Sequence, residues 1–107
     1  MTAAKFRSIA LSMPDAAEGA HMGHADFRVG GKIFATLGPD ESWGMVKLMP
    51  SEQKELLRAE PKALRPASGA WGRQGCTVIT LRAAKVAMVR EAMLSAWRNV
   101  AKKALDK

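Results

Sequence analysis

The sequence predicts an α+β fold, in which an antiparallel sheet is covered on one face by packed helices. Three observations predict this class. The Gly30-Gly31 pair separates two segments with strand-like composition, residues 77–81 are rich in β-branched side chains, and residues 85–101 repeat apolar residues at helical spacing. Consecutive strands joined by tight turns form antiparallel sheets, and helices then bury the apolar face of such a sheet.

A helix is expected at the beginning of the chain. Its apolar stripe has the i, i+3, i+4, i+7 spacing, formed by Phe6, Ile9, Ala10 and Met13. Thr2 is placed to cap the start of this helix, and Pro14 marks its end.

A run of strands follows this first helix. Residues 18–22 are weakly strand-like, residues 24–29 and 33–37 form the arms of the Gly30-Gly31 hairpin, and residues 45–49 form a further strand. A turn-rich acidic loop, residues 38–42, precedes that last strand. In a two-residue hairpin Phe27 and Phe34 would lie opposite each other, and we expect them to form a cross-strand pair in the core.

The second half alternates helix, strand and helix. A helix with Ser51 as its cap ends at Pro61, and a loop over residues 61–70 leads to the strand at 77–81. The helix over residues 85–101 should pack on the sheet through Val89, Met93 and Trp97. Lys102, Lys103 and Lys107 follow it as a solvated tail. A winged helix-turn-helix is the alternative, although its helices would be closer together in sequence.

Length and composition predict one domain over residues 1–107. The apolar share of 48% suits a globular chain of this size. A single cysteine, Cys76, excludes an internal disulfide and fits a reducing compartment. No apolar run has the length of a membrane span, so we expect a cytoplasmic protein with no membrane partner.

Positive charge is concentrated in the second half of the chain. Residues 1–60 contain seven Lys and Arg against eight Asp and Glu, whereas residues 61–107 contain ten against two. The formal net charge is +7 and the isoelectric point is near 10.1. A basic half of this kind suits a polyanionic partner, nucleic acid first, although a solubilising surface would have the same composition.

Two motifs resemble those of a known family. They are the segment from His24 to Ala35 and the later segment from Gly69 to Gly75, with Lys47 between them. Together they resemble the MmcQ/YjbR family of small bacterial proteins, and the likeness extends over nearly the whole chain. The resemblance implies a cyaY-like (frataxin-like) α+β fold and DNA binding through two β-hairpins that form a "double wing". Family members often have Pro at position 25 and Trp at position 76, where this chain has Ala25 and Cys76.

Five basic residues are the candidates for phosphate contacts. They lie on or beside the two motifs: Arg28, Lys32, Lys47, Arg65 and Arg73. Arginine grips phosphate through two parallel hydrogen bonds and lysine acts as a point charge. The sequence therefore favours non-catalytic binding of nucleic acid, with duplex DNA as the expected ligand. The alternative is a protein-interaction or small-ligand-sensing module that uses the sheet face, which a deep apolar pocket there would favour.

No cofactor, metal or catalytic machinery is expected. Glu18, His21, His24 and Asp26 form the nearest approach to a metal-ligand set, but their spacing matches no established site. Cys76 has no evident activating neighbour, and no serine lies in a nucleophile-elbow motif. Trp71 could stack on a base or plug the bottom of the sheet, and the sequence favours the plug.

Overall fold

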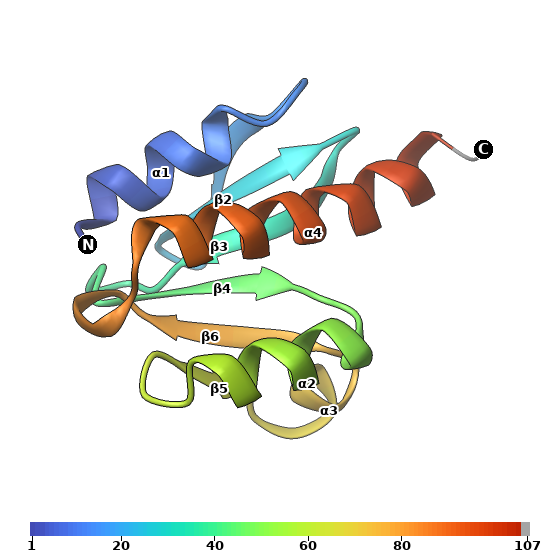
Figure 1. Cartoon of the computed structure of the whole chain (residues 1–107). Helices are drawn as coiled ribbons and strands as arrows, with labels where there is room; N and C mark the ends of the chain where they lie inside the picture. Colours follow the sequence, from blue (N-terminus) through green and yellow to red (C-terminus); the bar gives the residue numbers. More distant parts are fainter. Residues whose placement is uncertain (106–107) are drawn as a thin grey trace.

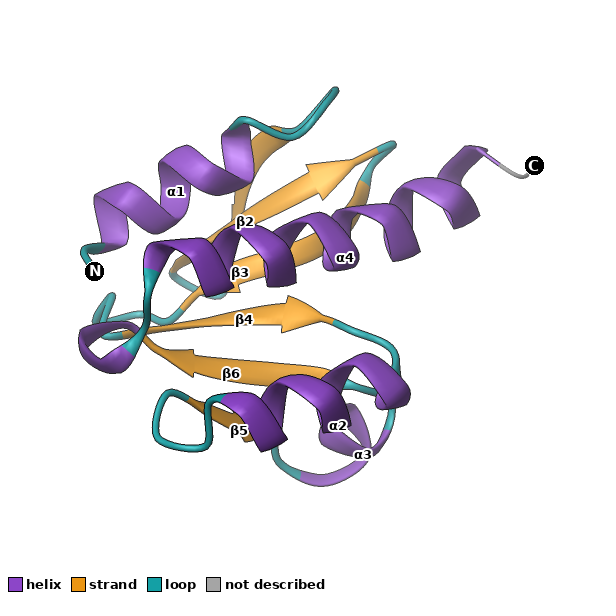
Figure 2. Cartoon of the chain, viewed as in Figure 1, coloured by secondary structure: helices purple, strands orange, loops and turns teal. Residues whose placement is uncertain are grey.

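The computed structural model describes residues 1–105 and has the expected α+β architecture (Figures 1 and 2). The helices are α1 (Ala3–Leu11), α2 (Pro50–Ala59), α3 (Gly69–Arg73) and α4 (Val86–Leu105), with a 3₁₀ turn at Leu81–Ala83. The strands are β1 (Ala17–His21), β2 (His24–Val29), β3 (Lys32–Leu37), β4 (Trp43–Lys47), β5 (Leu64–Pro66) and β6 (Cys76–Thr80).

The six strands form one antiparallel sheet in the order β1-β2-β3-β4-β6-β5. In Figure 1, α1 and α4 cross the near face of this sheet, and α2 lies in the same layer beside them. This face is called the helix face below. The short α3 lies behind the sheet, so the opposite face, called the open face, is partly covered at one end. The predicted arrangement of helices on one face is thus confirmed for the three longer helices.

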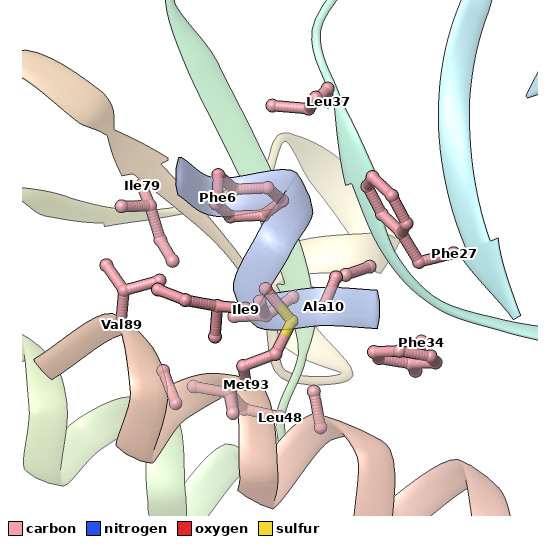
Figure 3. Packing of buried hydrophobic residues seen from close by; sticks show 14 of the residues in the cluster. Phe6, Ile9, Ala10, Phe27, Phe34, Leu37, Leu48, Ile79, Val89 and Met93 are labelled. Atoms are coloured by element: carbon pink, nitrogen blue, oxygen red, sulfur yellow. The ribbon is translucent and has the colours of Figure 1, made fainter. Parts of the chain in front are cut away.

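The core lies between the helix face and the helices α1 and α4 (Figure 3). Phe6 and Ile9 of α1 and Met93 of α4 are fully buried there, as the helical spacing predicts. Gly44 lies directly beneath Phe6, since a Cβ atom on residue 44 would lie 2.6 Å from the Phe6 ring. Only glycine allows α1 to pack this closely on β4.

The β2–β3 hairpin contains a bulge that the sequence did not predict. Gly30 and Gly31 form its turn with φ of 58° and 79°, as expected for a tight hairpin. Phe27 pairs with Ala35, however, and Arg28 pairs with Ile33, which leaves Phe34 as the extra residue. The expected Phe27–Phe34 cross-strand pair is therefore wrong, although both rings are fully buried in the core.

Two predictions about helix ends need correction. Met49, not Ser51, is the N-cap of α2, because Pro50 occupies the first helical position and the Glu52 carboxylate accepts a hydrogen bond of 2.8 Å from the Met49 N–H. Helix α4 continues to Leu105, so that Lys102 and Lys103 belong to its last turn and favour its C-terminal dipole. Lys107 lies outside the described residues.

The loop expected at residues 61–70 contains the edge strand β5, and α3 begins within it. Strand β5 has only three residues and ends at Pro66, so it lacks the length and the β-branched pattern that identify a strand. The five residues of α3 include two glycines, which explains why its sequence carries no helical signal.

Candidate nucleic-acid interface

The structure distributes the five candidate cations over both faces of the sheet. Side chains alternate between faces along a strand, so Arg28 of β2, Lys47 of β4 and Arg65 of β5 project from the open face. Lys32 lies opposite the buried Val29 and is exposed on the helix-face side of the hairpin tip. Four strand spacings, about 19 Å, separate β2 from β5, so Arg28 and Arg65 are too far apart for one small ligand.

Arg28 belongs to a buried polar cluster rather than to a free basic surface. Its Nε atom lies 2.7 Å from Asp26 Oδ1 and its Nη2 atom 2.9 Å from Oδ2. His21 Nδ1 lies 2.6 Å from the same Oδ2 atom. The Asp26 carboxylate is fully buried, and chiefly the hydrogen bond from Arg28 lowers its pKa to about 2 against the opposing effect of burial.

Arg65 and Arg73 lie at opposite ends of the open face. Arg65 lines a surface hollow at the start of β4, together with Trp43 and Arg82. Arg73 is exposed at the end of α3, between Trp71 and Gln74. Lys47 stands at the other end of β4 from Trp43, on the same side of the molecule as Trp71.

Lys47 lines a pocket of about 670 Å³, called the lysine pocket below. Its other cationic residues come from the last turn of α4, and its remaining walls from the β4–α2 connection and from α3. The polar and aromatic side chains that line it include those of Lys47, Trp71, Gln74, Asn99, Lys102 and Lys103. Three ammonium groups around one concave surface create a positive potential that attracts phosphate.

Asn99 fixes the elements that form this pocket. Its Nδ2 atom donates to the Lys47 backbone oxygen at 3.2 Å and to Glu52 Oε1 at 2.8 Å. One amide thus connects α4, the end of β4 and the start of α2, and the same Glu52 carboxylate caps α2 through Met49. The hairpin tip is held beside them, because a Cβ atom on Gly30 would lie 2.7 Å from Ala104 Cβ. Lys32 therefore stands at the same end of the molecule as Lys102 and Lys103.

A second pocket of about 380 Å³, called the sheet pocket, lies on the open face. Its walls come from the β1–β2 hairpin, from β3 and β4, and from the segment that leads into α3: His21, His24, Ile33, Thr36, Trp43, Met45, Lys47, Ala67, Ser68 and Trp71. Lys47 and Trp71 belong to both pockets, so the two are adjacent. Trp71 is 60% exposed, and the interpretation of this residue as a plug beneath the sheet is therefore wrong.

The lysine pocket also contains four residues that are not among the candidates predicted from the sequence: Asn99, Lys102, Lys103 and Gln74. A helix predicted to end at residue 101 leaves the two lysines in a solvated tail, whereas α4 continues through them to Leu105. The signal that could have identified them is the absence of any Pro or Gly between residues 85 and 107, which allows the helix to continue.

The acidic and imidazole residues near residue 20 do not converge on one point. Glu18 faces the helices, where its Oε1 atom lies 3.0 Å from Arg7 Nε, whereas His21 and Asp26 lie on the open face. Within residues 1–105, no group of three or more His, Cys, Asp or Glu side chains could hold a metal ion. Burial raises the pKa of the Cys76 thiol, which keeps it protonated and weakly nucleophilic at neutral pH.

Comparisons with known proteins agree on the fold. The YjbR family model matches residues 11–99. A crystal structure of protein DR2400 from Deinococcus radiodurans, with domain DUF419, matches 97% of this chain and 81% of its own at 20% identity, with a TM-score of 0.82. A Pseudomonas syringae protein matches 94% of this chain and 99% of its own at 16% identity, with a TM-score of 0.71. No curated protein sequence matches the chain.

None of the helices in the described part of the chain is long and apolar enough to cross a membrane.

Proposed function

The chain belongs to the YjbR family, and from that premise we propose that it is a non-catalytic nucleic-acid-binding protein that holds its ligand in the lysine pocket. The observation that carries the proposal is the convergence of Lys47, Lys102 and Lys103 on one pocket beside the exposed Trp71. Lysines contact phosphates, and an exposed aromatic ring offers a face on which a base stacks.

A single strand suits this site better than a duplex. Trp71 can stack only on a base that is not already stacked between two neighbours, and single strands and loops supply such bases. The Gly30-Gly31 tip, expected to act as a wing, packs against Ala104, and the Arg28 guanidinium beside it is engaged by Asp26. The turns at the two ends of β2 also point to opposite ends of the sheet, so they do not form a pair of adjacent wings.

A salt-dependent titration tests this proposal. We expect a labelled oligo-dT strand to bind more tightly than a duplex of equal length, with a slope of log K against log salt of about −2 for three lysine contacts. The strand should also be recovered at full length after incubation, because the proposed role is non-catalytic.

Two variants of equal charge change separate the pocket from diffuse attraction. Lys102→Glu with Lys103→Glu alters the pocket, whereas Lys62→Glu with Arg82→Glu alters exposed positions elsewhere. The first variant should reduce the magnitude of the salt slope by at least about 1.4 and the second should leave it nearly unchanged. Equal effects of the two variants, or no binding of either nucleic acid by the wild type, would contradict the proposal.

A second candidate function is favoured by the sheet pocket. The open face is not uniformly basic but contains a hollow lined by two tryptophans, two histidines, Ile33 and Met45. Small-molecule sites have this character, since they are largely apolar with a few polar groups. A module that binds a small ligand on the sheet face is therefore the alternative.

A further inference from the structure

We propose that the sheet pocket receives one nucleobase of the ligand whose phosphates lie on the lysine pocket. This inference rests on the proposed function and extends it to a specific nucleotide unit. The two pockets share Lys47 and Trp71, so a single ligand can occupy both. That ligand must be anionic at one end and flat, largely apolar and capable of hydrogen bonding at the other, which is the chemistry of a nucleotide.

The walls of the sheet pocket suit a base. Met45 and Ile33 provide an apolar floor on β4 and β3, and the indole of Trp43 forms a flat aromatic wall. A Cβ atom on Gly38 would collide with the Trp43 ring, so this indole lies directly on the backbone of the β3–β4 turn and is held in place. Thr36 and Ser68 carry hydroxyl groups that both donate and accept hydrogen bonds, as base edges require.

The histidines at the end of the β1–β2 hairpin add a polar edge that is fixed in position. The rings of His21 and His24 are 4.5 Å apart, and the Asp26 carboxylate lies 2.6 Å from His21 Nδ1, which holds the His21 ring in place. Arg28 in turn holds Asp26 from the other side. The buried Nδ1 atom of His24 has no hydrogen-bond partner among the described residues. An unsatisfied buried polar atom is uncommon, and this one belongs to a ring that lines the sheet pocket.

The distribution of charge explains why the base would enter the sheet pocket and the phosphate would bind at the lysine pocket. Among residues 1–105, Lys47 at the boundary is the one lysine that lines the sheet pocket, whereas Lys47, Lys102 and Lys103 line the lysine pocket. A phosphate on the lysine pocket therefore places its attached sugar near Lys47 and Trp71. From there the base can extend over Met45 while its neighbour along the strand stacks on Trp71.

An abasic scan of a bound strand tests this assignment. We expect abasic substitutions in an oligo-dT no longer than the site to weaken binding by at least about fivefold at two neighbouring positions, one for the enclosed base and one for the base on Trp71. Ser68→Phe fills the mouth of the sheet pocket from an exposed position. It should abolish the effect at one of these two positions while the salt slope stays unchanged. Ser8→Phe, an identical change at an exposed site on α1 over the other face, should behave like the wild type.

A titration with thymidine 5′-monophosphate provides a readout that does not depend on strand binding. We expect saturable NMR shifts of the His24 ring and the Thr36 amide in the wild type and in Ser8→Phe, but not in Ser68→Phe. A strand that binds with only one sensitive position, which Ser68→Phe leaves unchanged, would overturn the base pocket and leave the proposed function intact. Absence of strand binding would overturn the proposed function, and thymidine monophosphate shifts in that case would support the base pocket as a small-ligand site. Absence of both would overturn both.

Discussion

Asp26 holds Arg28 through two hydrogen bonds, with Arg28 Nε 2.7 Å from Oδ1 and Nη2 2.9 Å from Oδ2. The carboxylate is fully buried, whereas the Arg28 side chain is 38% exposed. The pair neutralises most of the charge of the arginine nearest the hairpin turn. An arginine that looks available for phosphate in the sequence is therefore largely committed to the protein itself.

The Asp26 carboxylate should make folding stability depend on acid pH. Its pKa in the folded protein is about 2, below the ordinary value of 3.8, so the unfolded chain binds this proton more readily. The stabilisation is complete above about pH 4 and is lost as the pH falls towards 2, a change of about 2 kcal/mol in the free energy of unfolding. Urea unfolding between pH 2 and 6 measures it. Asp26→Asn should lack this loss of stability at acid pH, whereas Asp15→Asn, a change at an exposed carboxylate, should retain it. If the stability–pH profiles of the wild type and Asp26→Asn superimpose, the assignment to Asp26 is wrong.

Arg28 and Lys47 should contribute unequally to nucleic-acid binding. Lys47→Gln removes a cation that lines both pockets, and should reduce the magnitude of the salt slope for oligo-dT by about 0.7. Arg28→Gln should change that slope by much less, because Asp26 already balances this charge, but it should lower the free energy of unfolding. Salt titrations and urea unfolding of both variants make the comparison. If Arg28→Gln changes the salt slope more than Lys47→Gln does, the β2–β3 hairpin and not the lysine pocket contacts the nucleic acid.

Trp71→Ala should separate binding from stability. The ring is 60% exposed, so its removal should change the free energy of unfolding by no more than about 0.5 kcal/mol. Loss of one stacked base should nevertheless weaken strand binding by about 1–3 kcal/mol. Trp71→Phe, which retains an aromatic face, should recover part of the affinity. Unchanged affinity in Trp71→Ala, measured by anisotropy, would show that this ring is not a stacking platform.

Gly44→Ala should destabilise the fold at the contact between α1 and β4. The added methyl group would lie 2.6 Å from the Phe6 ring and force a shift that costs about 1–3 kcal/mol. Phe6→Leu combined with Gly44→Ala should cost less than the sum of the two single changes, because the smaller side chain leaves room for the methyl group. Additive costs in urea unfolding would show that the two residues do not interact.

Most of the fold could be predicted from the sequence because its signals are local. The Gly30-Gly31 turn specifies its hairpin through φ, and the spacing of Phe6, Ile9 and Ala10 specifies the buried side of α1, which ends at Leu11 before Met13. The bulge at Phe34 could not be predicted, because two successive apolar residues also fit an ordinary strand that is buried on both faces. The register of β3 is decided by tertiary packing on the helices.

The candidate site was less predictable, because its residues come from segments far apart in the chain. Lys47 stands in the first half, and Lys102 and Lys103 stand at the end. Their convergence depends on the length of α4 and on the Asn99 hydrogen bonds that fix the end of β4. The exposure of Trp71 could not be predicted from the sequence, because an aromatic residue between small residues is equally compatible with a core position.

The hairpin turn has an evolutionary consequence. Gly30 is constrained twice, by its positive φ and by the methyl group of Ala104, whereas a Cβ atom on Gly31 would meet no described atom within 4 Å. Asparagine tolerates this backbone conformation, so replacement of glycine by asparagine is open at position 31 without a change at any other residue. At position 30 the same replacement requires a smaller residue at 104 first. Natural divergence of this turn should therefore be asymmetric, with position 30 changing only in lineages where the end of α4 has already changed.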